Sequence, residues 1–98
     1  MPRDVDLAWT LQFRFGGARR RRVLRTARDV VDLIAALTDA ERRCLHWAST
    51  LGAISRAMGS GHAKAALIAT EMVENALAVE GWLLAERAAD EAPSLLHA

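Results

Sequence analysis

Residues 5–15 alternate between apolar and polar side chains, which is the pattern of a β-strand with one buried face. Gly16-Gly17 then supplies a turn, and the chain returns through Arg19-Arg20-Arg21-Arg22-Val23-Leu24. The sequence therefore predicts an antiparallel β-hairpin of two strands over about residues 5–25. The apolar positions of its first strand are Val5, Leu7, Trp9, Leu11, Phe13 and Phe15.

The two strands of this hairpin are poorly matched, because an apolar strand meets a return strand rich in arginine. Residues that face each other across a hairpin lie on the same side of the sheet. Either the arginine stems lie on the apolar face, or the register places Val23 or Leu24 there and turns the charges outward. A hairpin of two strands is not stable alone in water, so its apolar face must rest on the remainder of the chain.

Helix-start signals follow the hairpin. Thr26 precedes an acidic residue by three positions, as in a capping box, and predicts a helix over about residues 27–37. Thr38 repeats the arrangement and predicts a second helix over about residues 40–58, with Cys44 on its apolar face.

A third helix is predicted from about residue 62 to residue 89, after the turn at Gly59-Ser60-Gly61. Its apolar side chains form two adjoining rows, and a face this wide needs cover on more than one side. The first row is Leu67, Thr70, Val73, Leu77 and Leu84, and the second is Ile68, Met72, Ala76, Val79 and Leu83.

The length of this last helix leaves two alternatives open. A helix of about 25 residues would span roughly 38 Å, which is long for a compact domain of this size. Either Gly81 interrupts the helix, or its end overhangs and packs on a second subunit. With residues 90–98 as a flexible tail, residues 1–98 are predicted to form a single α+β domain, a two-stranded hairpin packed on three helices.

The charge of the chain is divided unevenly. Residues 1–28 carry eight Arg and two Asp, for a net charge of +6, whereas residues 29–98 carry five basic and ten acidic residues, for −5. Such a chain can pair with itself or present a basic face to nucleic acid or to an acidic protein. The single cysteine, together with the absence of a signal peptide or a membrane-length apolar run, predicts a soluble, cytoplasmic protein that does not enter a membrane.

The order of segments resembles a bacterial family catalogued as domain of unknown function 982. The resemblance covers about residues 7–80, and the chain departs from the family in lacking a Trp-Pro pair after the first helix. It implies a hairpin with helices and supplies no established activity. The segments that carry it are Trp9 to Phe15, the Gly-Gly turn, the basic return strand, Thr26 at the first helix, Ala57-Met58-Gly59, and Ala63-Lys64-Ala65-Ala66-Leu67-Ile68-Ala69.

The sequence offers little for catalysis or for metal binding. Cys44 and His46 are the only close Cys/His pair, and on a helix they point about 200° apart, so they cannot share one ion. Glu71 and Glu74 lie on one helix face, where a solvated surface explains them better than an acid/base pair. We therefore expect no enzyme, no metal and no cofactor.

The strongest candidate site is an arginine cluster whose guanidinium groups can bind phosphates or carboxylates. The alternative is that the arginines protect an exposed edge strand from aggregation or pair with the acidic half of the chain. The cluster comprises Arg19, Arg20, Arg21, Arg22, Arg25 and Arg28. A second candidate is Trp82 with Leu83 and Leu84, at the predicted overhang, as a dimer or partner interface.

These features predict a small protein-interaction module, non-enzymatic, that docks on a partner protein and forms a homodimer. An adaptor or a mobile-element-encoded inhibitor of the anti-CRISPR type would fit this description. The alternative is a nucleic-acid-binding module that uses the arginine-rich hairpin on phosphates.

Overall fold

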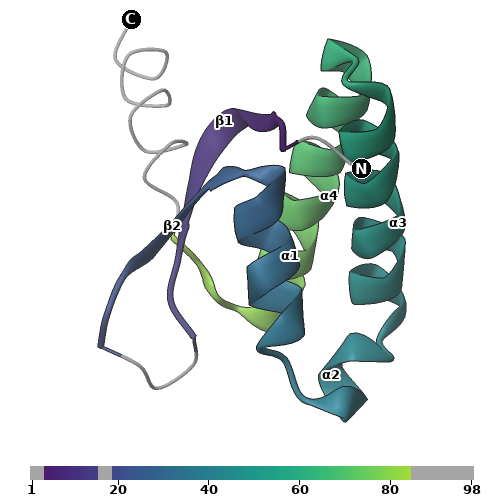
Figure 1. Ribbon diagram of the computed structural model, residues 1–98. Helices are drawn as coiled ribbons and strands as arrows, with labels where there is room; N and C mark the ends of the chain where they lie inside the picture. The colour runs from purple at the N-terminus through teal and green to yellow at the C-terminus, as the bar shows by residue number, and fades with distance from the viewer. Residues whose placement is uncertain (1–3, 16–18, 85–98) are drawn as a thin grey trace, which may run out of the picture.

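The computed structural model describes residues 4–15 and 19–84 of the chain. It confirms an α+β fold, with three strands and four helices in the described residues where the sequence predicts two and three (Figure 1). In chain order the elements are β1 (Asp6–Phe13), β2 (Arg22–Thr26), α1 (Ala27–Ala35), α2 (Asp39–Arg42), α3 (Leu45–Ser60), α4 (Ala63–Glu80) and β3 (Leu83–Leu84).

The register of the hairpin resolves the mismatch between its strands. Leu11 pairs with Leu24, and both are buried on the face that meets the helices. Phe13 pairs with Arg22, whose guanidinium carbon lies 6.0 Å from the centre of the Phe13 ring. Both alternatives therefore hold in part, because Leu24 completes the apolar face while the Arg22 side chain covers an aromatic ring at its margin.

The last helix is shorter than predicted, because Gly81 ends it. Gly81 adopts φ +77° as the residue after α4, a backbone conformation that favours glycine. The chain then turns back and places β3 beside β1, so the sheet order is β2-β1-β3. Of the two alternatives, the structure shows the interruption at Gly81 and not a helix over residues 62–89. The predicted tail at residues 90–98 lies outside the described residues.

The predicted helix over residues 40–58 is also wrong, because it is divided in two. The capping box of Thr38 is present, but α2 ends at Arg42 and α3 begins anew at Leu45. Cys44 has an extended backbone between them and is exposed, where the periodicity predicts a core position. Leu45 is 80% exposed for the same reason. The capping box of Thr26 starts α1 as predicted.

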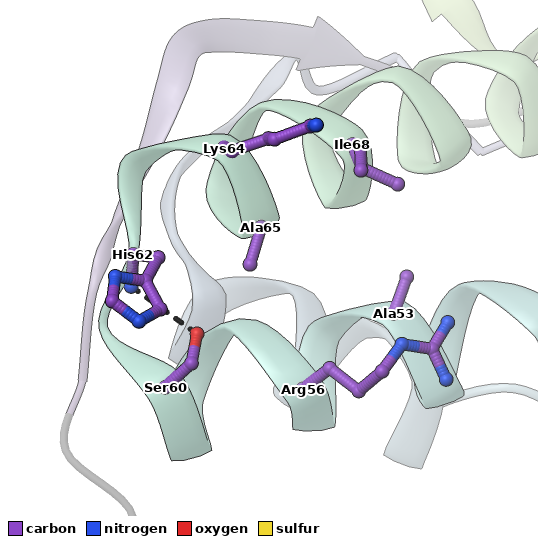
Figure 2. Close-up of a pocket in the computed structure, with 7 residues that line it drawn as sticks. All are labelled: Ala53, Arg56, Ser60, His62, Lys64, Ala65 and Ile68. Atoms are coloured by element: carbon purple, nitrogen blue, oxygen red, sulfur yellow. Dashed lines mark hydrogen bonds between the residues drawn. The ribbon is translucent and has the colours of Figure 1, made fainter.

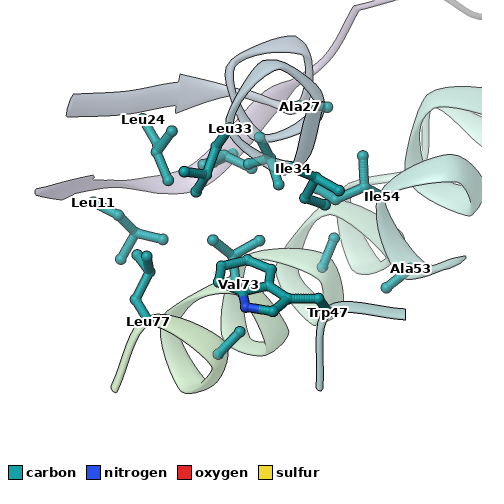
Figure 3. Close-up of a cluster of buried hydrophobic side chains, with 14 of the residues drawn as sticks. Leu11, Leu24, Ala27, Leu33, Ile34, Trp47, Ala53, Ile54, Val73 and Leu77 are labelled. Carbon is teal, nitrogen blue, oxygen red and sulfur yellow. The ribbon is translucent and has the colours of Figure 1, made fainter. Parts of the chain in front are cut away.

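The core lies between the sheet and the helices (Figure 3). α1 contacts β2, α4 contacts β1, and α3 packs against both helices. Trp47 of α3 is fully buried in this core. Thr70 ties α4 to the sheet, because its hydroxyl donates to the carbonyl of Ala66 and accepts from the backbone N–H of Ala8 at 2.9 Å. No helix in the described residues has the length and apolar content that crossing a membrane requires.

Candidate protein-docking site

The residues of the two apolar rows on α4 differ in how far they are buried. Val73 and Leu77 of the first row are fully buried against the sheet and α3. Ile68 and Val79 of the second row remain 44% and 61% exposed. Ala76 of the same row is buried, however, so the uncovered apolar positions of this row are Ile68 and Val79 and not a continuous strip.

A groove opens beside Ile68, where the end of α3 meets the start of α4 (Figure 2). Ala53, Ala65 and Ile68 point into the space between the two helices and form an apolar floor, in which two of the three side chains are small. The hollow has a volume of about 510 Å³ and is open to solvent along its length. We call it the basic groove, and its lining residues are Ala53, Arg56, Ser60, His62, Lys64, Ala65 and Ile68.

Cationic side chains stand on both walls of the basic groove. Arg56 comes from α3 and Lys64 from α4, and both are exposed. Among the described residues no carboxylate lies within ion-pair distance of either side chain. Arg56 lies back along α3, so that its Nη1 would be 3.6 Å from a Cβ at Gly52. The site thus joins an apolar floor to two positive charges that no carboxylate of residues 4–15 and 19–84 neutralises.

The turn between the helices holds this geometry in place. Gly61 ends α3 with φ +69°, and its backbone N–H donates to the carbonyl of Ala57 at 2.9 Å. The Ser60 hydroxyl accepts from the backbone N–H of His62, which fixes the step into α4 (Figure 2). The Gly-Ser-Gly sequence therefore serves as a tight connection between antiparallel helices, and it positions the two cationic walls.

A second hollow lies farther along the line where α3 packs against α4, toward the other end of the two helices. We call this line the seam. It has a volume of about 580 Å³ and a mixed lining, so we call it the polar groove. It follows the basic groove because Ile68, Met72 and Asn75 succeed one another at helical spacing on α4. The polar groove is lined by Leu45, His46, Ser49, Thr50, Glu71, Met72 and Asn75.

Glu80 closes the seam at its far end. One oxygen of its carboxylate, Oε2, accepts from Trp47 Nε1 at 2.7 Å and lies 3.2 Å from His46 Nε2. His46 and Glu80 are each about one-fifth exposed. Because Trp47 is fully buried, this bond satisfies an indole N–H that water cannot reach. The arrangement fixes the end of α4 against the start of α3.

The predicted arginine cluster is divided by the fold. Arg19, Arg20 and Arg21 precede the strand, whereas Arg22 and Arg25 lie within β2, and all five are exposed. We call these five residues the Arg arm, and in Figure 1 the start of β2 lies away from the helices, whereas its end adjoins α1. The Arg22 guanidinium carbon lies 5.8 Å from the ring centre of Phe15, so the structure supplies the aromatic neighbour that the linear sequence lacks within the arginine run.

The sixth arginine of the predicted cluster is engaged elsewhere. Arg28 Nε lies 3.4 Å from Asp32 on α1, and its backbone N–H donates to Asp4. The Asp29 carboxylate accepts from the backbone N–H of Arg25 at 2.8 Å. The capping box of α1 therefore also occupies a backbone donor of the edge strand, which agrees with a protective role for this edge.

Trp82, Leu83 and Leu84 follow the end of α4 and lie beside the sheet. The Trp82 ring is half-buried, with centres 5.0 Å from Phe15 and 6.1 Å from Trp47. Its backbone carbonyl accepts from the N–H of Arg14 at 2.9 Å, which extends the pairing of β1 with β3. A subunit or partner interface at these residues stays a prediction, now at the edge of a sheet.

The remaining candidates are not brought together. Glu71 is exposed in the polar groove, and Glu74 is half-buried and has an interaction of its own. Within residues 4–15 and 19–84, no three His, Cys, Asp or Glu side chains are placed to hold a metal ion. Sequence reasoning missed the basic groove, although the second apolar row of α4, with Lys64 one turn before Ile68, was a visible signal for it.

Comparison of the chain with protein-family models, curated proteins and solved structures gives no match. The resemblance to domain of unknown function 982 therefore stays a prediction.

Proposed function

We propose that this protein is a non-enzymatic protein-interaction module that holds a partner protein along the seam of α3 and α4. The observation that carries the proposal is the basic groove, where an apolar floor that includes the exposed Ile68 lies between Arg56 and Lys64. Neither cation has a carboxylate partner among the described residues. An apolar concavity ringed by charge is the usual form of a protein-binding surface.

The surroundings of the groove support a protein partner in particular. Val79 and Leu45 extend the apolar surface toward the far end of the seam, where they are 61% and 80% exposed. The binding surface is therefore longer than the hollow itself, which favours an elongated partner over a small molecule. A module of this kind acts by binding to its partner and not by catalysis, as an adaptor or an inhibitor does.

The proposal is tested by photo-crosslinking in the cells that produce the protein. A benzophenone amino acid replaces Ser60, on the groove wall, or Ala35, an exposed residue of α1 that serves as the matched control. We expect a discrete conjugate with one identified protein from position 60 only, and its loss when Ile68→Asp is added. Equal conjugates from both positions, or none from position 60, would contradict docking at this seam.

One observation favours a second function, nucleic-acid binding at the Arg arm. Arg22 is held over the Phe13 and Phe15 rings at 6.0 and 5.8 Å, and four further exposed arginines lie close to it in the sequence. Positive charge next to aromatic rings is a common arrangement for single-stranded nucleic acid. Phe13 is only 2% exposed, however, so its face is not free to stack on a base. We therefore rank this function second.

A further inference from the structure

We infer that the partner segment held by the basic groove is an amphipathic α-helix that carries carboxylates on both flanks of its apolar face. This inference rests on the proposed function and names the chemistry of the occupant. The shape of the seam and the charge of its walls support it independently.

The shape of the seam fits a third helix. α3 has 16 residues and α4 has 18, and they run antiparallel over a length of about 24 to 27 Å at 1.5 Å per residue. Side chains of a third helix fit into the furrow between two packed helices. The small side chains of Ala53 and Ala65 leave room in the floor for larger apolar groups such as leucine.

The charge of the groove fixes the polar residues of the occupant. Arg56 and Lys64 stand on opposite walls, so a helix lying between them meets a positive charge on each flank. A carboxylate on each flank would form two ion pairs at the margin of an apolar contact, where they select the partner more than they add affinity. Glu71 lies in the polar groove, so the same partner helix should be neutral or basic toward that end.

Two synthetic helices with the same stripe of leucines test this inference. Both are labelled peptides of about 16 residues, a length of about 24 Å that matches the seam. One carries Glu on both flanks of the half that lies in the basic groove, and the other carries Lys at the same positions. The half that lies in the polar groove is neutral in both peptides. We expect fluorescence anisotropy to show at least tenfold tighter binding of the Glu peptide, and loss of that binding in Ile68→Asp.

Charge reversal provides the decisive control. The double variant Arg56→Glu with Lys64→Glu should reverse the preference, and Arg56→Gln with Lys64→Gln should abolish it without introducing repulsion. Both residues are exposed, and glutamate near the start of α4 suits the helix dipole, so both variants should fold. Replacing the four arginines at positions 19–22 by Ser should leave the preference unchanged.

Three results would overturn the inference. These are equal binding of the two peptides, failure of both to bind, or a preference for Glu that depends on the arginines at positions 19–22 and not on Arg56 and Lys64. None of these three results changes what the crosslinking experiment at position 60 shows. The peptide experiment and the crosslinking experiment therefore distinguish a wrong prediction about the carboxylates of the partner helix from a wrong prediction that a partner docks at the seam.

Discussion

The Arg arm and the basic groove are both positively charged, but they differ in what surrounds the charge. The arm presents five exposed arginines in β2 and in the residues before it. Arg21 donates to Gln12, and Arg22 lies over the rings of Phe13 and Phe15. The groove presents two cations around an apolar hollow between helices.

This difference separates attraction from recognition. Exposed charge attracts any polyanion, and that attraction is screened by salt. Charge beside an uncovered apolar surface selects a partner, because burial of the apolar surface supplies affinity and the charges reject partners of the wrong sign. The richer arginine cluster is thus the more conspicuous feature of the sequence, and the groove is the more specific site in the structure.

The largest effect should come from Trp47, because both regions depend on the core around it. Trp47→Ala removes a fully buried side chain, and loss of a buried aromatic typically costs about 3–5 kcal/mol of a total stability of about 5–15 kcal/mol. Urea unfolding measures the loss of stability. Trp47→Phe should show a smaller loss. A stable Trp47→Ala variant would contradict the described core.

The next largest effect should be a difference between the two regions in the salt dependence of binding. We expect labelled single-stranded DNA to bind the Arg arm through exposed charge only. Neutralising about four phosphates of a single strand predicts a loss of roughly fiftyfold in affinity between 50 and 200 mM salt. Peptide binding in the groove should change by less than tenfold over the same range. Anisotropy titrations of both probes measure the contrast. A similar salt dependence at the two sites would remove the distinction drawn between them.

Loss of the Glu80 carboxylate should weaken the packing of α3 against α4 and leave the Arg arm unchanged. Glu80→Ala leaves the indole N–H of Trp47 buried without its acceptor, at a cost of about 1–3 kcal/mol. Glu80→Gln keeps an amide oxygen as acceptor and should lose less. Urea unfolding ranks the three proteins, with wild type the most stable. Equal stability of the Ala and Gln variants would show that the bond to Trp47 contributes little.

Two glycines near helix ends should give the smallest effects, with opposite signs. Gly81 has φ +77°, so Gly81→Ala should destabilise the fold by about 1–2 kcal/mol and loosen β3. Gly59 is helical and exposed, and a Cβ added there would have no atom within 4 Å, so Gly59→Ala should stabilise α3 by about 1 kcal/mol. Thermal unfolding of the two variants tests whether Gly81 has the left-handed backbone conformation described above. Equal shifts would contradict it.

The sequence predicts those parts of this fold that short-range chemistry determines. The alternation of residues 5–15 and the capping residues Thr26 and Thr38 identify β1 and the starts of α1 and α2. The break after α2 is different, because Cys44 and Leu45 continue the apolar periodicity and only the tertiary structure turns them outward. The third strand likewise depends on a contact between residues 13 and 83, which no local pattern reveals.

The candidate site shows the same limit. The second apolar row of α4 is visible in the sequence, and so is its need for cover. Which neighbour covers it depends on how α3 and α4 pack, and the described elements leave Ile68 and Val79 exposed. Arg56 and Lys64 are 8 residues apart in the chain, and only the antiparallel pairing of the helices places them on facing walls.

The most direct test is the affinity of the partner identified by crosslinking for two variants of the purified protein. Ile68→Asp changes the groove alone, and Ser at positions 19–22 changes the arm alone. We predict that Ile68→Asp weakens binding at least thirtyfold, while the arm variant changes affinity by less than threefold and mainly slows association. Strong loss in the arm variant with no loss in Ile68→Asp would contradict the groove as the docking site.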